Sequence, residues 1–440
     1  MFKTIANAWK IPDLRKKMLF TILIVVIFRI GSVIPVPFLD VAALKTVMDS
    51  MTSGNNIFSY VDALSGGAFS NGTLFAMSVT PYINASIIIQ LLTVAIPPLE
   101  RLAKEGAEGR KRLGTITRYV TVILGIVQGT AYYVYLASSG VVSYTGWTFD
   151  GIFTGVVIVA VFTAGTALMM WLGEQINQNG LGNGISILLF VGIIARMPVY
   201  IQTWWGNFSL GLQGDVSKVI NSIIILVLFL ALIWVIVFMN DAERRIPIQY
   251  AKRVVGRKMY GGQSTYLPIK VGLSGVMPII FASSILSIPS TILMFIGEDT
   301  PTGFWKGFFD AFSMGSWLYT ILYFLMILGF AYFYVAIQYN PVEMANNLRQ
   351  NNGTIPGIRP GKPTSDFIAK ILSKITLIGA MFLAVIAIVP LVFSSATGMS
   401  NMMMGGTSII ILVGVALDTM KQLESQMVMR HYNNGKGFLG

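Results

Sequence analysis

The sequence predicts an all-α polytopic membrane protein with ten transmembrane helices. Three observations support this prediction: charged residues are scarce, ten long apolar runs are present, and basic residues gather in alternate connections. Hydrophobic residues make up 54% of the 440-residue chain and charged residues only 11%. Because soluble proteins carry about 25% charged residues, the deficit indicates a chain that lies largely within a membrane.

Each of the ten apolar runs is long enough to cross a bilayer, which takes about 20 residues of helix. The runs cover residues 18–37, 73–97, 116–137, 152–172, 183–203, 218–239, 274–296, 316–338, 371–394 and 406–425. Lys16 and Lys17 precede the first run as in a signal peptide, but no small-residue cleavage site follows Val36. We therefore expect a retained first span.

Lys and Arg set the predicted orientation, because cytoplasmic loops carry an excess of both. Most of the 31 basic residues lie in the N-terminal segment, in segments 98–118, 240–273 and 339–374, and in the C-terminal tail. Both termini are therefore predicted to be cytoplasmic, as an even number of spans requires.

The runs also divide evenly along the chain. Five of them lie in residues 1–215 and five in residues 216–440. An odd number of spans in each half is compatible with an inverted repeat, although this interpretation rests on counting alone.

The stretch 55–97 joins two unlike pieces. Residues 57–72 are apolar, short, interrupted by glycines and carry Asp62, whereas residues 73–97 are long enough to span and contain Pro81 and Gln90. Irregular backbone at membrane depth is tolerated only where protein buries it or where it lines a cavity. The stretch therefore suggests a half-inserted plug followed by a cavity-lining helix, with an ordinary loop and span as the alternative.

Few charged groups lie inside the runs. Arg29 either lines a vestibule, pairs with Asp62 or extends outward to water, whereas Glu174 and Asp418 lie near the cytoplasmic face. The chain has no Cys, a single His, and no metalloprotease, serine-hydrolase or P-loop motif. We therefore expect no catalytic residues, no metal and no cofactor.

Several bulky apolar residues stand beside helix breakers. If they met midway through the membrane they would form a hydrophobic constriction, which excludes water and ions. Plain packing of the spans is the alternative. These residues are Val79, Ile83, Ile185, Leu189, Ile280 and Ile411.

The segments 240–273 and 339–374 are longer than a simple connection needs, and their Gly and Pro residues predict turns. Their basic side chains either face water and anionic lipid or form a docking surface for an acidic partner, such as RNA phosphate or an acidic protein patch. These residues are Lys252, Arg253, Arg257, Lys258, Arg359 and Lys362. A small-solute transporter and a membrane scaffold or insertase remain alternatives to a channel.

The motifs resemble those of the SecY family, the channel subunits of the bacterial protein-conducting translocon, along essentially the whole chain. The stretches that carry the resemblance are FRIGSVIPVP (28–37), LSGGAFSNGTLFAMSVTPYINASIIIQLL (64–92), EGAEGRKRL (105–113), MWLGEQINQNGLGNGISI (170–187), YAKRVVGR (250–257), QSTYLPIKV (263–271), GVMPIIFASSI (275–285), NPVEMANNLRQNNGTIPGIRPGKPT (340–364) and GGTSIIILVGVALDTMKQLESQ (405–426). An accessory paralogue of the housekeeping channel is a second interpretation of the same motifs.

The resemblance implies a passive pore in the cytoplasmic membrane that translocates signal-bearing unfolded polypeptides and releases transmembrane segments sideways into lipid. It implies two pseudo-symmetric five-helix halves around an hourglass pore, hinged between the fifth and sixth spans. It also implies the companion subunits SecE and SecG, and docking of the SecA ATPase or the ribosome on the basic loops. Tyr266 departs from the family, which often has His there.

The resemblance further assigns roles to individual residues. The external plug falls on residues 56–69, with Ile57, Asp62, Leu64, Ser65, Gly66 and Gly67. The pore ring falls on the six apolar residues named above, with Val79 and Leu189 as departures from an all-isoleucine ring. The lateral gate falls on Asn84, Ile87, Ile88, Gln90, Ser283, Ser284 and Ile288. We expect the polar members of this gate to hydrogen-bond across the seam and hold it closed.

Overall fold

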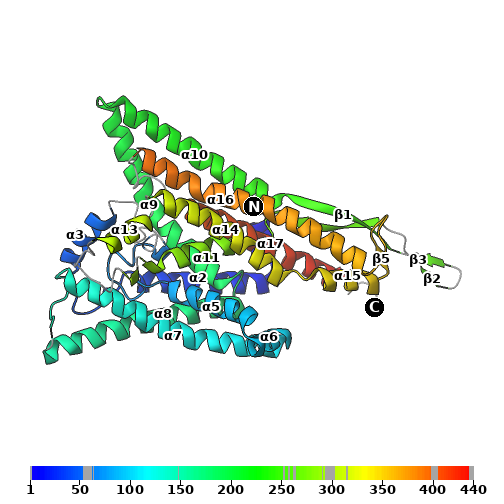
Figure 1. Cartoon of the computed structure of the whole chain (residues 1–440), viewed down its shortest axis with the longest axis horizontal. Coiled ribbons are helices and arrows are strands. Elements are labelled where there is room, and N and C mark those ends of the chain that lie inside the picture. Colours follow the sequence, from blue (N-terminus) through cyan, green and yellow to red (C-terminus); the bar gives the residue numbers. More distant parts are fainter. Residues whose placement is uncertain are drawn as a thin grey trace.

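A computed structural model describes residues 2–52, 62, 64–146, 148–250, 253–255, 258–260, 264–289, 291–292, 303–313, 316–397 and 405–435. Within these ranges the chain forms a long bundle of helices with a small group of strands at one end (Figure 1). The predicted all-α membrane class agrees with this architecture.

The N-terminal part of the chain forms eight helices. They are α1 (Phe2–Trp9), α2 (Pro12–Gly31), α3 (Val41–Thr52), α5 (Thr80–Ala95), α6 (Pro97–Lys104), α7 (Ala107–Ser138), α8 (Phe149–Asn179) and α9 (Gly184–Leu212). Asn183 caps α9 by accepting a hydrogen bond from the Ser186 amide, and Thr148 caps α8 in the same way. Such caps satisfy amide groups that have no partner inside the helix.

The C-terminal part adds seven helices in the described residues. They are α10 (Val216–Asp241), α11 (Met277–Leu286), α13 (Phe304–Ala311), α14 (Trp317–Gln338), α15 (Pro341–Gln350), α16 (Lys362–Thr397) and α17 (Gly406–Gly435). Pro81 and Pro278 lie at the first turns of α5 and α11, where proline has no amide to leave unpaired.

Each of the ten predicted runs contains a helix, but length and apolarity alone do not confirm ten spans. Among the described residues, seven helices are long and apolar enough to cross a membrane, or up to eight if the pair α5 and α6, bent by 103°, forms one span. The remaining runs correspond to α2, which carries Arg15, Lys16, Lys17 and Arg29, and to α11, which is short.

The first two runs differ from the prediction at their external ends. Helix α2 ends at Gly31 rather than near residue 37, and α5 begins at Thr80 rather than at residue 73. The backbone turns at Gly72 and Ser78, both of which have positive φ, so the helix cannot extend backward through them. Residues 34–36 instead hydrogen-bond to residues 72–74, through Val36 N to Gly72 O and Leu74 N to Ile34 O, both at 3.0 Å.

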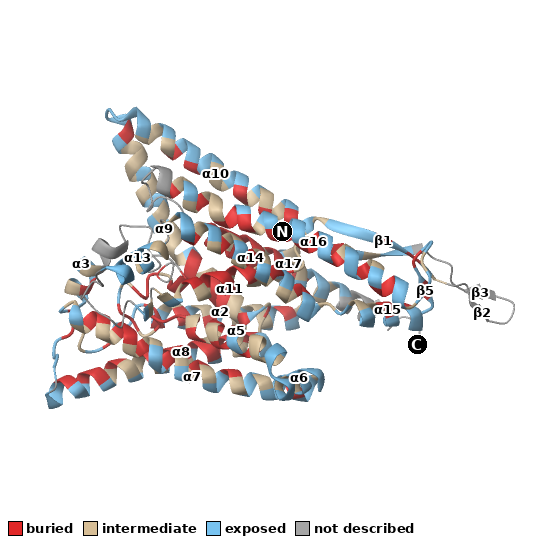
Figure 2. Ribbon diagram, viewed as in Figure 1, coloured by how far each residue is buried: buried red, intermediate tan, exposed pale blue. Residues whose placement is uncertain are grey.

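A large apolar core lies between the helices, with contributions from α2, α5, α9, α11, α14 and α17. Figure 2 shows these buried positions in the middle of the bundle and exposed positions along its outer helices. The outer faces remain apolar; Trp234 on α10, for example, is 68% exposed. Exposed apolar faces on helices of this length fit contact with lipid.

The long basic segments 240–273 and 339–374, predicted to be loops with Gly and Pro turns, contribute strands to a sheet. Strand β1 (Glu243–Tyr250) pairs antiparallel with β4 (Ser264–Lys270) on one side and with β5 (Gly353–Thr354) on the other. In β1, Ile246 and Ile248 are buried while their neighbours are exposed, the alternation of a half-buried strand. They pack with residues of α15 and α16, including Leu348 and Ile368.

Two short strands, β2 (Arg253–Val255) and β3 (Lys258–Tyr260), form a hairpin beyond this sheet at the far end of the molecule (Figure 1). The two ends of the described chain meet at the same end of the bundle, because α1 packs against α17. Thr4 donates a hydrogen bond to Glu424 at 3.4 Å. Lys421 pairs with Asp241 at 2.9 Å, next to β1, which places α17 beside the sheet.

We predict that Gly165→Ala will destabilise the protein, because a methyl group at this position of α8 would overlap the carbonyl oxygen of Leu74. Forcing extra volume into a packed interior costs about 1–3 kcal/mol. The temperature at which the detergent-purified protein loses half of its monodisperse fraction should fall. Gly114→Ala in exposed α7, where nothing lies within 4 Å, should leave it unchanged or raise it; equal shifts would contradict the prediction.

Candidate functional site

An irregular buried segment, residues 64–79, lies within the bundle and includes the C-terminal part of the predicted plug. Leu64, Ser65, Phe75 and Ser78 are all at most 5% exposed. The segment satisfies its own backbone: the Ser65 hydroxyl accepts from the Phe69 amide at 3.0 Å, and Asp62 Oδ1 accepts from the Ser70 amide at 2.8 Å. It therefore meets the condition for non-helical backbone at membrane depth. Ile57 lies outside the described residues.

Three helices hold the irregular segment. On α9, a side chain at Gly192 would overlap the carbonyl oxygen of Leu64, so the two backbones touch. On α8, a side chain at Gly165 would overlap the carbonyl oxygen of Leu74. Within the segment, the Ser78 hydroxyl donates to the Leu64 carbonyl at 3.5 Å. On α7, the Tyr132 hydroxyl donates to the Phe69 carbonyl at 2.7 Å, and the two rings stack with centroids 4.5 Å apart.

Pairing of Arg29 with Asp62, one of the alternatives for Arg29, is not among the ion pairs of the described residues. Asp62 is fully buried and forms an ion pair with Arg196 of α9. One guanidinium nitrogen of Arg29, Nη1, is buried without a hydrogen-bond partner in the described part of the chain. It would lie 3.2 Å from a side chain placed at Gly66.

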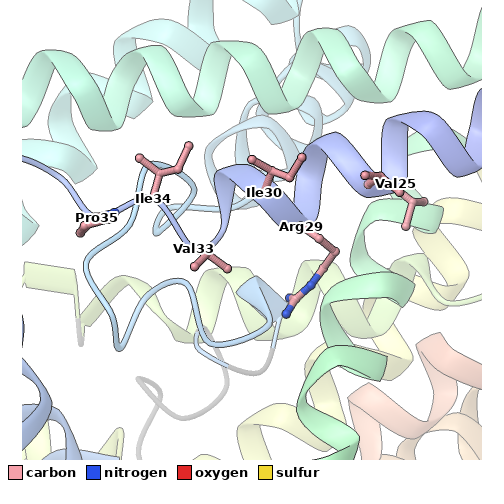
Figure 3. A pocket seen from close by; sticks show the side chains of 7 residues that line it. Val25, Arg29, Ile30, Val33, Ile34 and Pro35 are labelled. Atoms are coloured by element: carbon pink, nitrogen blue, oxygen red, sulfur yellow. The ribbon is translucent and has the colours of Figure 1, made fainter.

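The Arg29 side chain is half-buried. In Figure 3 its guanidinium points away from Ile30 and Ile34. A shallow, largely apolar pocket lies along α2. It is lined by Val25, Val26, Arg29, Ile30, Val33, Ile34 and Pro35. Sequence reasoning missed Arg196, although a charge inside the run 183–203 was the signal that could have identified it.

Four of the six predicted ring residues, Val79, Ile83, Leu189 and Ile411, are buried in one apolar core. The other two, Ile185 and Ile280, are partly buried and pack against it. Together the six come from α5 and its N-cap, α9, α11 and α17.

Leu189 links the ring residues to the irregular segment. Leu189, Gly192 and Arg196 follow each other at the spacing of one face of α9. The predicted ring residue therefore lies next to the glycine that contacts Leu64, and the charged residue lies one turn beyond that glycine.

The predicted gate residues lie on α5 and α11, which contact each other, except Ile288, which follows α11. Ile87 and Ser283 are buried, Ser284 is half-buried, and Ile88 and Ile288 are exposed.

The polar gate residues do not all bond as expected. Gln90 does not bond across the seam: its amide donates to Ser86 at 3.3 Å, which lies one turn earlier on the same helix. The side-chain oxygen of Asn84 is buried with no partner in the described residues.

The predicted docking residues fall at the strand end of the molecule. Arg359 and Lys362 are exposed. Arg359 lies in a turn bounded by Gly357 and Gly361, both with positive φ, and Lys362 begins α16. Arg253 begins β2 and Lys258 begins β3, whereas Lys252 and Arg257 lie outside the described residues.

The strand surface carries a further basic side chain that the sequence did not single out. Arg245 on β1 lies over the ring of Tyr266 at 5.5 Å. It also pairs with Glu243 at 2.7 Å.

The family model SecY matches residues 73–420. The protein translocase subunit SecY of Streptomyces scabiei is 44% identical over 448 residues, covering 100% of both chains. This chain belongs to the SecY family. The corresponding subunit of Bacillus licheniformis is 43% identical over 446 residues, again with full coverage of both chains. SecY is a family of translocation channels, not of enzymes.

Solved structures share the SecY fold. A structure described as that of a protein-conducting channel aligns with a TM-score of 0.66 at 18% identity, covering 96% of this chain and 97% of the other. Sec61 in the canine ribosome–channel complex aligns with a TM-score of 0.60 at 16% identity, with the same coverage. A channel structure whose title concerns the plug domain of SecY aligns with a TM-score of 0.64 at 17% identity, covering 96% of this chain and 97% of the other.

We predict that Tyr132→Phe will loosen the irregular segment, because it removes the hydrogen bond from α7 to the Phe69 carbonyl and leaves that carbonyl with the Gly72 amide, at 3.1 Å, from within the segment. Loss of one such hydrogen bond costs about 0.5–1.5 kcal/mol. Amide hydrogen exchange in residues 64–79 should speed up. Tyr119→Phe on the same helix removes an exposed hydroxyl and serves as the control; unchanged exchange in Tyr132→Phe would contradict the prediction.

Proposed function

We propose that this chain forms the channel of a protein translocase, a passive pore that moves signal-bearing unfolded polypeptides across the cytoplasmic membrane and releases transmembrane segments into lipid. Membership of the SecY family supports the activity. The observation that most directly supports the channel assignment is the contact between the Leu64 carbonyl and Gly192. This contact positions an irregular buried segment beside the predicted ring residue Leu189.

In this proposal the six apolar residues form the ring of an hourglass pore, and residues 56–69 form the plug on its external side. Apolar side chains cannot replace the hydration shell of an ion, so a narrow apolar ring is dry and does not conduct. The plug adds a second barrier, because its buried turns fill the space between α5, α7 and α9. A polypeptide passes only after the plug has moved.

The lateral gate is the seam between α5 and α11 and their neighbours α7 and α14. Lipid is as apolar as leucine, so the hydrophobic effect does not hold such a seam closed; packing and hydrogen bonds must do so. The buried, unpartnered oxygen of Asn84 weakens the closed seam, because an unsatisfied polar atom costs about 1–3 kcal/mol. A signal helix that enters the seam therefore competes with a closed state that is only moderately stable.

The two halves, residues 1–215 and 216–440, move against each other about the connection between α9 and α10. This connection is short, from Gln213 to Asp215. The Trp204 indole donates to the Ser222 carbonyl at 2.9 Å across the two helices. This bond keeps the proposed hinge closed on its external side while the opposite side of the bundle opens.

The strand end of the molecule is the cytoplasmic docking surface. Its exposed cations, including Arg359 and Lys362, suit RNA phosphate or acidic protein surfaces, and the related Sec61 structure is a ribosome complex. We assign the ribosome and the SecA ATPase as docking partners, SecE and SecG as companion subunits, and anionic lipid as the partner of the remaining basic residues. The chain has no nucleotide-binding motif, so a partner supplies the energy. Both termini then lie on the cytoplasmic side.

The proposed function predicts that deleting residues 57–67 will create an ion leak. The deletion removes the plug, so the apolar ring becomes the only remaining barrier to ions and any transient widening of the ring opens the pore. Planar-bilayer recordings of the chain, purified with the subunits that accompany it, should show openings that are rare in the intact channel. A scaffold or insertase would show no added conductance. A small-solute transporter would instead show saturable uptake coupled to an ion gradient, and either result would overturn the proposal.

Arg359→Glu should weaken docking of the ribosome or of the motor ATPase, because it places a negative charge in an exposed basic turn of the strand end. We expect the affinity to fall by about tenfold or more, as for loss of a charge contact worth roughly 1.4 kcal/mol. Co-sedimentation of the purified complex with ribosomes, or with the ATPase, measures this. Lys111→Glu, an equal charge reversal on exposed α7, is the control; equal loss in both variants would contradict a specific docking role.

A further inference from the structure

A buried carboxylate ties the irregular segment to α9. The side chain of Asp62 is fully buried, and each of its two oxygens has a separate task. Oδ1 accepts from the Ser70 amide at 2.8 Å and so closes a turn within the segment. Oδ2 faces the guanidinium of Arg196. The carboxylate therefore joins the internal structure of the segment to a neighbouring transmembrane helix.

The ion pair lies directly beside the backbone contact that seats the segment. Gly192 of α9 touches the Leu64 carbonyl, and Arg196 lies one turn further along the same face. The aliphatic part of Arg196 also lies against Gly67. Steric fit at Gly192 and charge pairing at Arg196 thus act on the same few residues, but only the pairing depends on charge.

A second cation lies beside the segment. Arg29 of α2 places a buried nitrogen on the side of Gly66 that also faces the Gly192 backbone, so the segment carries one buried acid near two arginines from different helices. If the segment moved away, Arg196 would lose its partner and two cations would face the vacated space. Leaving a buried charge without its partner is strongly unfavourable, so the arrangement opposes departure of the segment and attracts it back.

We propose that Asp62 and Arg196, with Arg29 beside them, are positioning residues that latch the irregular segment over the pore and thereby set how often the idle channel opens. This proposal rests on the proposed function, in which that segment is the plug. The latch acts through charge, so it is separable from the packing of the segment against Gly192.

Single-channel recordings of the purified complex test the latch. Asp62→Asn and Arg196→Gln should each raise the open probability of the idle channel by roughly tenfold or more, as expected for breaking a buried ion pair that is partly open to water. Arg196→Lys keeps the charge and should open much less often than Arg196→Gln. The swap Asp62→Arg with Arg196→Asp restores a pair and should reduce the leak relative to either single charge-removing variant.

Two variants control for loss of charge on the same side of the membrane. Asp40→Asn removes an exposed acid that caps α3, and asparagine caps equally well. Lys218→Gln removes a cation that pairs with Asp215 near the surface, at 2.8 Å. Neither should change the open probability.

The outcomes separate the latch from the proposed function. If the deletion of residues 57–67 leaks but Asp62→Asn and Arg196→Gln stay closed, the latch is wrong and the channel assignment stands. If the deletion itself does not leak, the proposed function fails and the latch fails with it. If the charge-removing variants leak but neither Arg196→Lys nor the swap recovers closure, the two residues have only a structural role and the latch is overturned.

Discussion

The structure depends on one constraint: backbone that leaves the helical conformation at membrane depth must find all of its hydrogen bonds within the protein. Residues 64–79 meet this constraint through serine and aspartate side chains, the Tyr132 hydroxyl and pairing with residues 34–36. Each of these partners fixes part of the surrounding bundle. Helices α7, α8 and α9 must approach closely enough to bury the segment, and Gly165 on α8 and Gly192 on α9 are the positions that allow this approach.

The same requirement limits how the segment can move. The polar groups of the segment form hydrogen bonds either in the observed position or in water. Positions between these two leave polar groups without hydrogen bonds and are unfavourable. We therefore expect the segment to be either fully bound in the bundle or fully released, unlike a flexible loop. The apolar core around Val79 and Leu189 needs no hydrogen bonds and can close around whatever occupies the middle of the bundle.

Sequence reasoning reached the membrane class and the positions of ten helices, because apolar run length is a strong local signal. It also identified 55–97 as unusual, since glycines and Pro81 mark breaks in the chain itself. It did not identify the partner of Asp62, because finding Arg196 requires knowing which helix passes nearby, and no local pattern contains that. It overlooked the sheet for a similar reason: β5 has only two residues, Gly353 and Thr354, and is defined by a partner strand more than 100 residues away in the chain.

That sheet joins several helices of the C-terminal half. Strand β1 continues from α10, β4 leads through residues 271–276 into α11, and β5 lies between α15 and α16. The buried residues Ile246, Leu348 and Ile368 join these parts in one core. Under the proposed function, a force that a docked partner applied to either long connection would be shared among these helices, while α5 and α7 would receive none of it through the chain. The sheet would then convert a push on this end of the molecule into displacement of α11 relative to α5.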